Sequence, residues 1–550
     1  MRVGALKRSY AIAAVAAVLA LFARTAAFSY IGLDDAAYTF RNPFVAGGFS
    51  LANVVESFAN LRHGGIWMPA TYISYMLDAS ICRYAGMPLI GWMHLVNVLL
   101  HILNFLLLCR FLFVTLDDGK CSAPLLLAAL FWAIHPLRAE PVAWIAARKE
   151  LLWTFFALLG LLCRLDLRKW RWTYLFCLLA CLSKPTAMCF PFLVCLVDWL
   201  SRREHDAKAD GKPFEQFVKL RYLPLFIMAA ATAAIAAYSQ THVAGQGVIP
   251  LYVTTFGHRV INALSAFGFY LRATLLPFGL HVDCRAVPGL WPLGAVLDLG
   301  ALALFAVSVV WSCLLAGKAS SAKVKVLFAL GWFIVSLVPT SGLLGDFGME
   351  AHADRFSYLP SMGFSFLVAA FFLRARSVAW RYVAGVLVVA FAVLTFRQLG
   401  FWIDDSVAHE RALACDSLHP RAMVHVADAR CSRRRDFDGG ISLYRKALSL
   451  SDTVPPGGLD DADVKSRLAY ALASRGRYED FQEVKRLGAD VLGDFRIDRR
   501  GMMLDALGTA FMCDGDFKRA ALLFKASIEA PNRFWPKAST LRKLEECKRR

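Results

Sequence analysis

Two adjacent aspartates, Asp34 and Asp35, follow directly after the first apolar segment of the chain, residues 10–28. A charge beside hydrocarbon loses hydration, so acids at the mouth of a membrane helix usually bind a cation, move a proton or activate a nucleophile. Neighbouring carboxylates can hold different pKa values, so one can orient a hydroxyl group while the other accepts its proton. The pair therefore predicts general-base chemistry at a membrane surface. The alternative is a helix-end pair that water solvates.

The composition supports a membrane setting. Of 550 residues, 58% are hydrophobic and 19% are charged, and the mean hydropathy is +0.49, which excludes an ordinary soluble domain. The net charge of +19 falls largely in short loops between apolar segments, where it sets topology, so we expect no nucleic-acid partner. The 14 cysteines form no CxxC and no zinc-like spacing, so neither a disulfide framework nor a zinc site is predicted.

Twelve apolar segments precede residue 400, several of them shorter than the ~20 residues that cross a bilayer comfortably. They fall at about 10–28, 89–115, 123–137, 151–165, 172–184, 187–200, 222–238, 259–280, 293–316, 326–344, 357–374 and 379–397. The first follows a basic N-terminus, and we expect an uncleaved signal anchor rather than a cleaved signal peptide, which has a similar pattern.

Two kinds of loop separate these segments. The basic loops are 164–171, 202–221, 318–325 and 374–381, and the loops with few net positive charges are 29–88, 138–150, 239–292 and 345–356. Positive-inside asymmetry puts every basic loop in the cytoplasm only if 259–280, which contains Arg259 and Arg272, is re-entrant or interfacial. We therefore predict about 11 spans, with the N-terminus cytoplasmic and the C-terminal region on the other side. Twelve crossings would export two basic loops.

The chain after residue 400 is predicted to be a separate domain, 401–550. Three units each have a first helix with small residues, a Gly/Asp-aromatic turn and an Ala-containing second helix; they begin near Ala422, Leu468 and Leu504. This pattern is typical of tetratricopeptide repeats, with a loop insertion at 453–459, and it predicts an α-solenoid. The alternative is a general bundle of helical hairpins. The fold class is therefore all-α, a polytopic membrane domain followed by repeats.

Several motifs, taken in order, resemble the bacterial tetratricopeptide-repeat membrane proteins related to the transmembrane and tetratricopeptide-repeat-containing O-mannosyltransferases, in the GT-C glycosyltransferase superfamily. The matching pieces are 34–38 (DDAAY), 67–78 (WMPATYISYMLD), 94–97 (HLVN), 101–104 (HILN), 135–150 (HPLRAEPVAWIAARKE), 183–185 (SKP) and 353–360 (ADRFSYLP). The resemblance implies a GT-C membrane domain in a bacterial inner membrane. It also implies transfer of a mannose-like sugar from a polyprenyl-phosphate donor to a protein or other acceptor on the non-cytoplasmic face, with inversion.

That chemistry needs a carboxylate to deprotonate the acceptor hydroxyl and cations or a metal to stabilise the departing phosphate. Asp34 and Asp35 are the candidates for the base, and Glu140 is a second acceptor or metal contact. The candidate phosphate ligands are Arg148, Lys149, Lys184 and Arg355, with His135 and Asp354 in supporting roles. Snorkelling side chains and a structural Asp354–Arg355 pair are the alternatives. The sequence identifies no cofactor with certainty, and it leaves open whether the reaction uses a divalent metal ion.

The polar residues His94, Asn97, His101 and Asn104 recur at helical spacing, so they share one face. We expect them to bond neighbouring helices, with a metal site as the alternative. The repeats are expected to recruit an acceptor protein. A non-catalytic membrane scaffold or transporter that uses its repeats for assembly is the alternative function. A transporter would carry acids within its spans, near the middle of the bilayer. The candidate acids of this chain lie at loop edges instead, which favours the enzyme.

Overall fold

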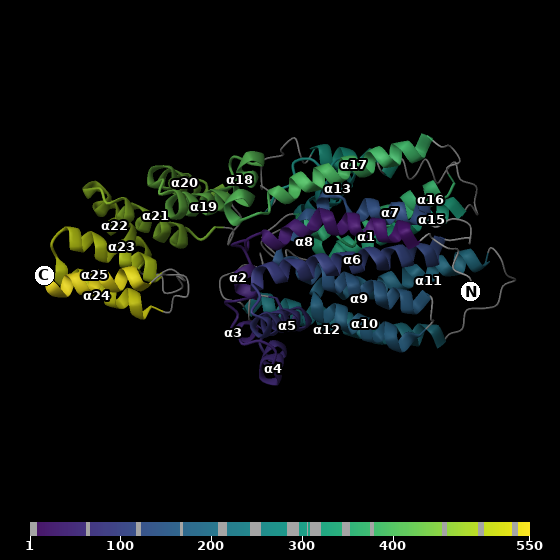
Figure 1. Cartoon of the computed structure of the whole chain (residues 1–550), viewed down its shortest axis with the longest axis horizontal. Coiled ribbons are helices and arrows are strands. Elements are labelled where there is room, and N and C mark those ends of the chain that lie inside the picture. Colours follow the sequence, from purple (N-terminus) through teal and green to yellow (C-terminus); the bar gives the residue numbers. More distant parts are fainter. Residues whose placement is uncertain are drawn as a thin grey trace. The chain divides into compact units, whose positions relative to one another are not determined.

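The computed structural model describes residues 8–61, 66–116, 123–165, 169–206, 217–242, 255–282, 296–304, 306–307, 321–343, 352–374, 379–453, 459–492, 500–530 and 537–550. All secondary-structure elements assigned in these ranges are helices, which confirms the all-α prediction. Contacts between residues divide the chain into two compact units, Met1–Ala408 and His409–Arg550. Figure 1 shows the helices of both units.

The first unit is a helical membrane domain. Five helical stretches of the described chain are long and apolar enough to cross a membrane: Ser9–Ala27, Leu89–Leu116, Leu220–Ser239, Ala322–Thr340 and Tyr382–Gly400. A bent pair, Ala123–Ala133 with Pro136–Ala143, passes the same test with an angle of 59° between its halves. The total of 11 crossings stays a prediction, because most of the expected span 293–316 and most of the loop 345–356 lie outside the described residues. Most of the segment 259–280 lies in helix α13, Phe256–Leu275, which is not among the five.

Helix α6, Leu89–Leu116, is packed against several other helices of this unit. Figure 1 shows α6, α9 and α10 running side by side, and α9 contacts both neighbours. The other long helices are α1 Arg8–Phe22, α7 Ala123–Ala133, α9 Arg148–Leu165, α10 Trp170–Ser183, α11 Phe190–Asp206, α12 Phe217–His242, α15 Ser321–Leu337, α16 Met362–Phe372 and α17 Ala379–Gly400.

Three of the four polar residues on this face of α6, Asn97, His101 and Asn104, hydrogen-bond to neighbouring segments, as the sequence predicted. Asn97 donates to the carbonyl of Trp144 at 3.1 Å, and Asn104 donates to that of Leu151 at 3.0 Å. His101 Nδ1 lies 2.7 Å from the hydroxyl of Tyr358. Since lipid offers no hydrogen bonds, such contacts satisfy polar groups inside a membrane domain and fix neighbouring helices to one another.

Several helices, most of them short, build the segments between the spans. Within 29–88 these are α2 Asp35–Tyr38, α3 Pro43–Ala46, α4 Leu51–Ala59 and α5 Pro69–Ala85. Within 135–150 they are η3 Pro136–Arg138, α8 Ala139–Ala143 and η4 Ile145–Ala147, before α9 starts at Arg148. Prolines at the first positions of α3, α5 and η3 are tolerated there, because the first N–H groups of a helix have no partner within it.

The second unit is a series of helical hairpins in which consecutive helices pack against one another. Its elements are α18 Asp405–Cys415, which starts in the first unit, then α19 Pro420–Ala429, η8 Arg430–Arg434, α20 Phe437–Ser449, η9 Ser451–Thr453, α21 Asp461–Arg475, α22 Tyr478–Val491, α23 Arg500–Cys513, α24 Phe517–Glu529 and α25 Lys537–Arg549. Gly476 and Gly515 have positive φ values of 79° and 81° at two of the turns, a conformation that glycine adopts without steric cost.

Small residues let these hairpins pack closely. Ala427, Ala469, Ala506 and Ala510 are fully buried in one core with Tyr444 and Leu472. The three predicted helix pairs are all present. Their assignment to tetratricopeptide repeats stays a prediction, and most of the proposed 453–459 insertion lies outside the described residues.

Candidate functional site

The two aspartates lie in different environments. Asp35, at the start of α2, is fully buried, and its carboxylate accepts hydrogen bonds from the backbone N–H groups of Ile31 and Ala146, both at 2.7 Å. The side chain of Asp34 is 40% exposed. Only Asp34 is therefore open to an approaching molecule, whereas Asp35 fixes the loop before α2 against the segment before α9.

Burial, and to a smaller extent the Asp34 charge, raise the pKa of Asp35 from its usual value to about 7. The two backbone hydrogen bonds and Lys149 lower it, but they offset burial only in part. A buried carboxylate loses more hydration than two N–H groups replace. Asp35 is thus poised to change its charge near neutral pH.

Asp34 faces a cation and a phenol. Its Oδ2 lies 3.9 Å from Nζ of Lys149, whose side chain is only 5% exposed. The hydroxyl of Tyr38 hydrogen-bonds to Asp34, and burial raises the pKa of Tyr38 well above its usual value, so this hydroxyl stays a donor. The Lys149 ammonium lies 4.7 Å from the centre of the Tyr38 ring. One exposed carboxylate is therefore held between a buried cation and a buried hydroxyl.

Aromatic rings link three of the predicted cations. The Trp144 ring lies 5.8 Å from Nζ of Lys149 and 4.8 Å from the guanidinium carbon of Arg355. The Phe356 ring lies 4.7 Å from the same carbon and 4.9 Å from Nζ of Lys184. Ring faces attract cations, so Lys149, Arg355 and Lys184 form one cluster although they come from distant parts of the sequence. We call these three residues the cation cluster.

Two buried acids pair with this cluster. Glu140 pairs with the Arg355 guanidinium at 2.5 Å, and Glu150 pairs with Lys184. Glu150 also accepts a hydrogen bond from the Trp153 indole at 2.9 Å. Glu140 is 1% exposed and is already paired with Arg355. Its geometry therefore fits a role in holding Arg355 in position.

Asp354 is fully buried, and neither of its carboxylate oxygens has a hydrogen-bond partner among the described residues. Burial raises its pKa well above the usual value, the charge of Glu140 adds to that rise, and Arg138 and Arg355 oppose it. Burial therefore favours the uncharged form of Asp354 beside the cation cluster.

Two predicted residues are engaged elsewhere. Arg148 is fully buried, pairs with Asp78 and donates to Asn97 and to the Met93 carbonyl, both at 2.8 Å. These contacts join α9 to α5 and α6. His135 accepts a hydrogen bond from the Leu137 N–H at 3.2 Å and its Nε2 lies 3.0 Å from the Thr274 carbonyl. Both geometries fit a structural role.

Sequence reasoning missed four residues here: Tyr38, Trp144, Glu150 and Phe356. All four lie inside the quoted motifs, and Glu150 and Phe356 directly follow selected residues. A buried lysine needs a carboxylate partner, so Lys184 could have pointed to an acid such as Glu150. Nothing in the sequence shows which acid that is.

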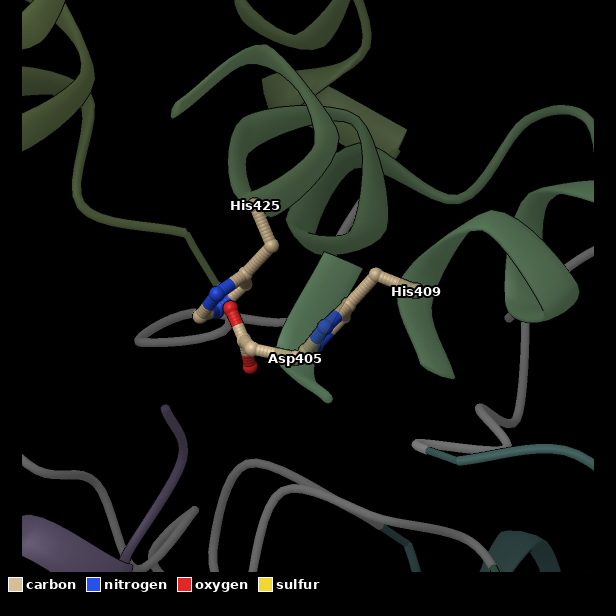
Figure 2. A group of neighbouring side chains, drawn as sticks. All are labelled: Asp405, His409 and His425. Carbon is tan, nitrogen blue, oxygen red and sulfur yellow. The ribbon is translucent and has the colours of Figure 1, made fainter. Parts of the chain in front are cut away.

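One group in the described part of the chain has side chains spaced for a metal ion: Asp405, His409 and His425, shown in Figure 2, with ligand atoms within 4.8 Å of one another. Asp405 and His409 lie one turn apart on α18. The His409 and His425 rings are stacked, with centres 4.0 Å apart and planes 8° apart. The nitrogen lone pairs of two stacked parallel rings point in parallel directions and do not converge on one point. One of the two histidine rings would therefore have to rotate before both could bind the same metal ion.

Comparison with known proteins gives one informative match. The chain is 24% identical over 389 residues to a protein O-mannosyl-transferase of Caenorhabditis elegans, covering 67% of this chain and 52% of that protein. The chain thus spans about half the length of the relative that it matches. No protein-family model matches it, and neither does any solved structure. Over two thirds of its length, this membrane protein is similar to an O-mannosyl-transferase.

Proposed function

We propose that this protein is a membrane glycosyltransferase that moves a mannose-like sugar from a polyprenyl-phosphate donor to a hydroxyl group of a protein or other acceptor. The observation that carries the proposal is the exposed carboxylate of Asp34, 3.9 Å from Lys149 at the edge of the buried cation cluster. The distant similarity to an O-mannosyl-transferase supports the same reaction class.

The proposed reaction uses Asp34 as the general base. The carboxylate accepts the proton of the acceptor hydroxyl, and the hydroxyl oxygen attacks the anomeric carbon of the sugar. The bond from that carbon to the phosphate oxygen breaks, and polyprenyl phosphate leaves with the electron pair. Attack from the face opposite the leaving group inverts the anomeric centre. Lys149, Lys184 and Arg355 oppose the negative charge that develops on the phosphate.

Asp35, Glu140 and Glu150 act as positioning residues in this scheme. Asp35 orients Asp34 through the backbone at Ile31 and Ala146. Glu140 and Glu150 hold Arg355 and Lys184 in place. Preorganised charges are effective because they need not reorient during the reaction. We place the site on the non-cytoplasmic face, with the C-terminal unit recruiting the acceptor there.

The test is transfer of radiolabelled sugar from polyprenyl phosphate to endogenous acceptor in membranes that carry Asp34→Asn. Loss of a general base typically lowers the rate about 10²–10⁴-fold. Glu56→Gln is the matched control, because Glu56 is an exposed acid of the same 29–88 segment and should leave transfer unchanged. Full activity of correctly inserted Asp34→Asn would instead favour the non-catalytic scaffold or transporter.

A further inference from the structure

One residue of helix α13, Tyr270, bonds to both backbone polar groups of Ala353. The Ala353 N–H donates to the Tyr270 hydroxyl at 3.0 Å, and the same hydroxyl donates to the Ala353 carbonyl at 3.1 Å. Ala353 has an extended backbone, with φ −143° and ψ 143°. A phenolic hydroxyl can donate and accept at once, so Tyr270 makes the two bonds that a neighbouring strand would otherwise make.

The bonded residue stands at the start of a turn that belongs to the cation cluster. Helix η7, Asp354–Ser357, begins directly after Ala353, and the Ala353 carbonyl also accepts from the Phe356 N–H at 3.0 Å, which closes its first turn. That turn carries Arg355, whose guanidinium carbon lies 4.7 Å from the centre of the Phe356 ring. The Tyr270 hydroxyl therefore fixes the backbone from which Arg355 projects.

Helix α13 is itself held in place by close packing and by an ion pair. A Cβ atom at Gly268 would lie 2.0 Å from the Asp298 carbonyl oxygen, so only glycine permits this approach of the two backbones. One turn later, Arg272 pairs with Asp298 at 2.5 Å, and the Asp298 side chain is 5% exposed. The Tyr270 ring lies in a buried core with Phe333 of α15. The hydroxyl of Tyr270 thus projects from a firmly supported helix.

A phenylalanine ring would fill the same space but would leave the Ala353 N–H without its bond to the hydroxyl. Ala353 is 2% exposed and Tyr270 is 0% exposed, so water cannot readily replace that bond. An unpaired buried N–H group carries a desolvation penalty. The segment at Ala353 would therefore be less firmly ordered, and Arg355 would be held at its backbone N–H by Glu140 alone, at 3.1 Å.

We propose that Tyr270 is a positioning residue for the phosphate of the lipid-linked donor, and that it acts through Ala353 on Arg355. The inference rests on the proposed function, because that function assigns Arg355 to the donor phosphate. The Tyr270 proton is donated to Ala353, so Tyr270 acts through the backbone rather than on the phosphate itself. A charge that is already in place binds its ligand without a further ordering cost.

The consequence is selective, because Asp34 and Lys149 share no printed contact with Tyr270 or Ala353 in the described part of the chain. Tyr270→Phe in the full-length protein should raise the Kd for farnesyl phosphate, a short isoprenyl monophosphate, about 10-fold. Isothermal titration calorimetry in detergent measures this value. In sugar transfer the donor KM should rise by a similar factor, while the acceptor KM stays unchanged.

Thr274→Val is the matched control. Thr274 lies one turn after Tyr270 on α13, and its hydroxyl donates to the Tyr270 carbonyl at 2.6 Å, a bond within the helix. This variant should keep the wild-type affinity for farnesyl phosphate. Hydrogen exchange, followed by mass spectrometry, gives a second measurement: the amides of Ala353 and Arg355 should exchange faster in Tyr270→Phe only, and exchange across α6 should stay as in the wild type.

The other outcomes overturn the proposal. Faster exchange at Ala353 with unchanged farnesyl phosphate affinity would make Tyr270 a structural residue only, as would faster exchange across α6. Weaker affinity with unchanged exchange would mean that Tyr270 does not act through Ala353. Equal rises in donor KM and acceptor KM would exclude a role specific to the phosphate. A wild type that binds farnesyl phosphate but transfers no sugar would refute the proposed function, and the affinities would still decide the role of Tyr270.

Discussion

Glu140 accepts two hydrogen bonds from Arg355, one from the guanidinium at 2.5 Å and one from the backbone N–H at 3.1 Å, across 215 residues of sequence. The contact joins helix α8, after the bend that follows α7, to η7, Asp354–Ser357. It fixes both the position of the Arg355 backbone and the direction of its charge. The cation cluster therefore depends on a tertiary contact between two loops that lie far apart in the chain.

Glu140→Gln should destabilise the membrane unit strongly. Removing one partner of a buried ion pair leaves an uncompensated charge and typically costs about 3–5 kcal/mol. The measurement is the thermal unfolding midpoint in detergent. Glu410→Gln is the control, since its pair with Arg434 is exposed at 39% and 54% and such pairs contribute about 0–1 kcal/mol. Equal shifts in the two variants would contradict a structural role for Glu140.

Asp35 should make stability depend on pH. Its folded-state pKa is raised from 3.8 to about 7, so the folded state binds a proton more tightly than the unfolded state does. The resulting stabilisation is fully present below pH 4 and is lost as the pH rises towards 7. Unfolding midpoints between pH 4 and 8 measure this. Asp35→Asn should remove that part of the pH dependence, and an unchanged profile would refute the assignment.

Lys149→Met should weaken use of the donor more than use of the acceptor. Hydrogen bonds to charged groups contribute roughly 1.5–3 kcal/mol, so kcat/KM for polyprenyl-phosphate sugar should fall about 10- to 100-fold. Initial rates at varied donor concentration give this value. Lys465→Met is the control, because Lys465 lies in the C-terminal unit beside Asp490. A normal donor kcat/KM in Lys149→Met would remove this residue from the phosphate site.

The C-terminal unit should be reachable from outside the cytoplasm. Cys415 and Cys513 are exposed in that unit, so a membrane-impermeant maleimide should label both in spheroplasts. The double variant Cys415→Ser, Cys513→Ser should lose that label while expression stays unchanged. Labelling that appears only after the membrane is broken would mean that 259–280 crosses and that the topology has 12 spans.

The sequence by itself determined the class of this protein. Apolar runs of membrane length, the Asp34–Asp35 pair after the first of them and the small-residue pattern after 400 depend on local composition and periodicity. These signals predicted an all-α membrane protein with helical hairpins, and the structure has both. The polar face of α6 could also be predicted from the sequence, because helical spacing alone places Asn97 and Asn104 on the same face of the helix.

Only the tertiary structure decided how the two aspartates differ and which charges meet. Asp34 and Asp35 are neighbours in sequence, yet one is 40% exposed and the other fully buried. That difference arises from the fold around Ile31 and Ala146 rather than from residue type. Likewise, Arg148 and Lys149 are adjacent, but consecutive side chains on a helix point about 100° apart. One meets Asp78 and the other meets Asp34, because long-range packing decides what each helix face contacts.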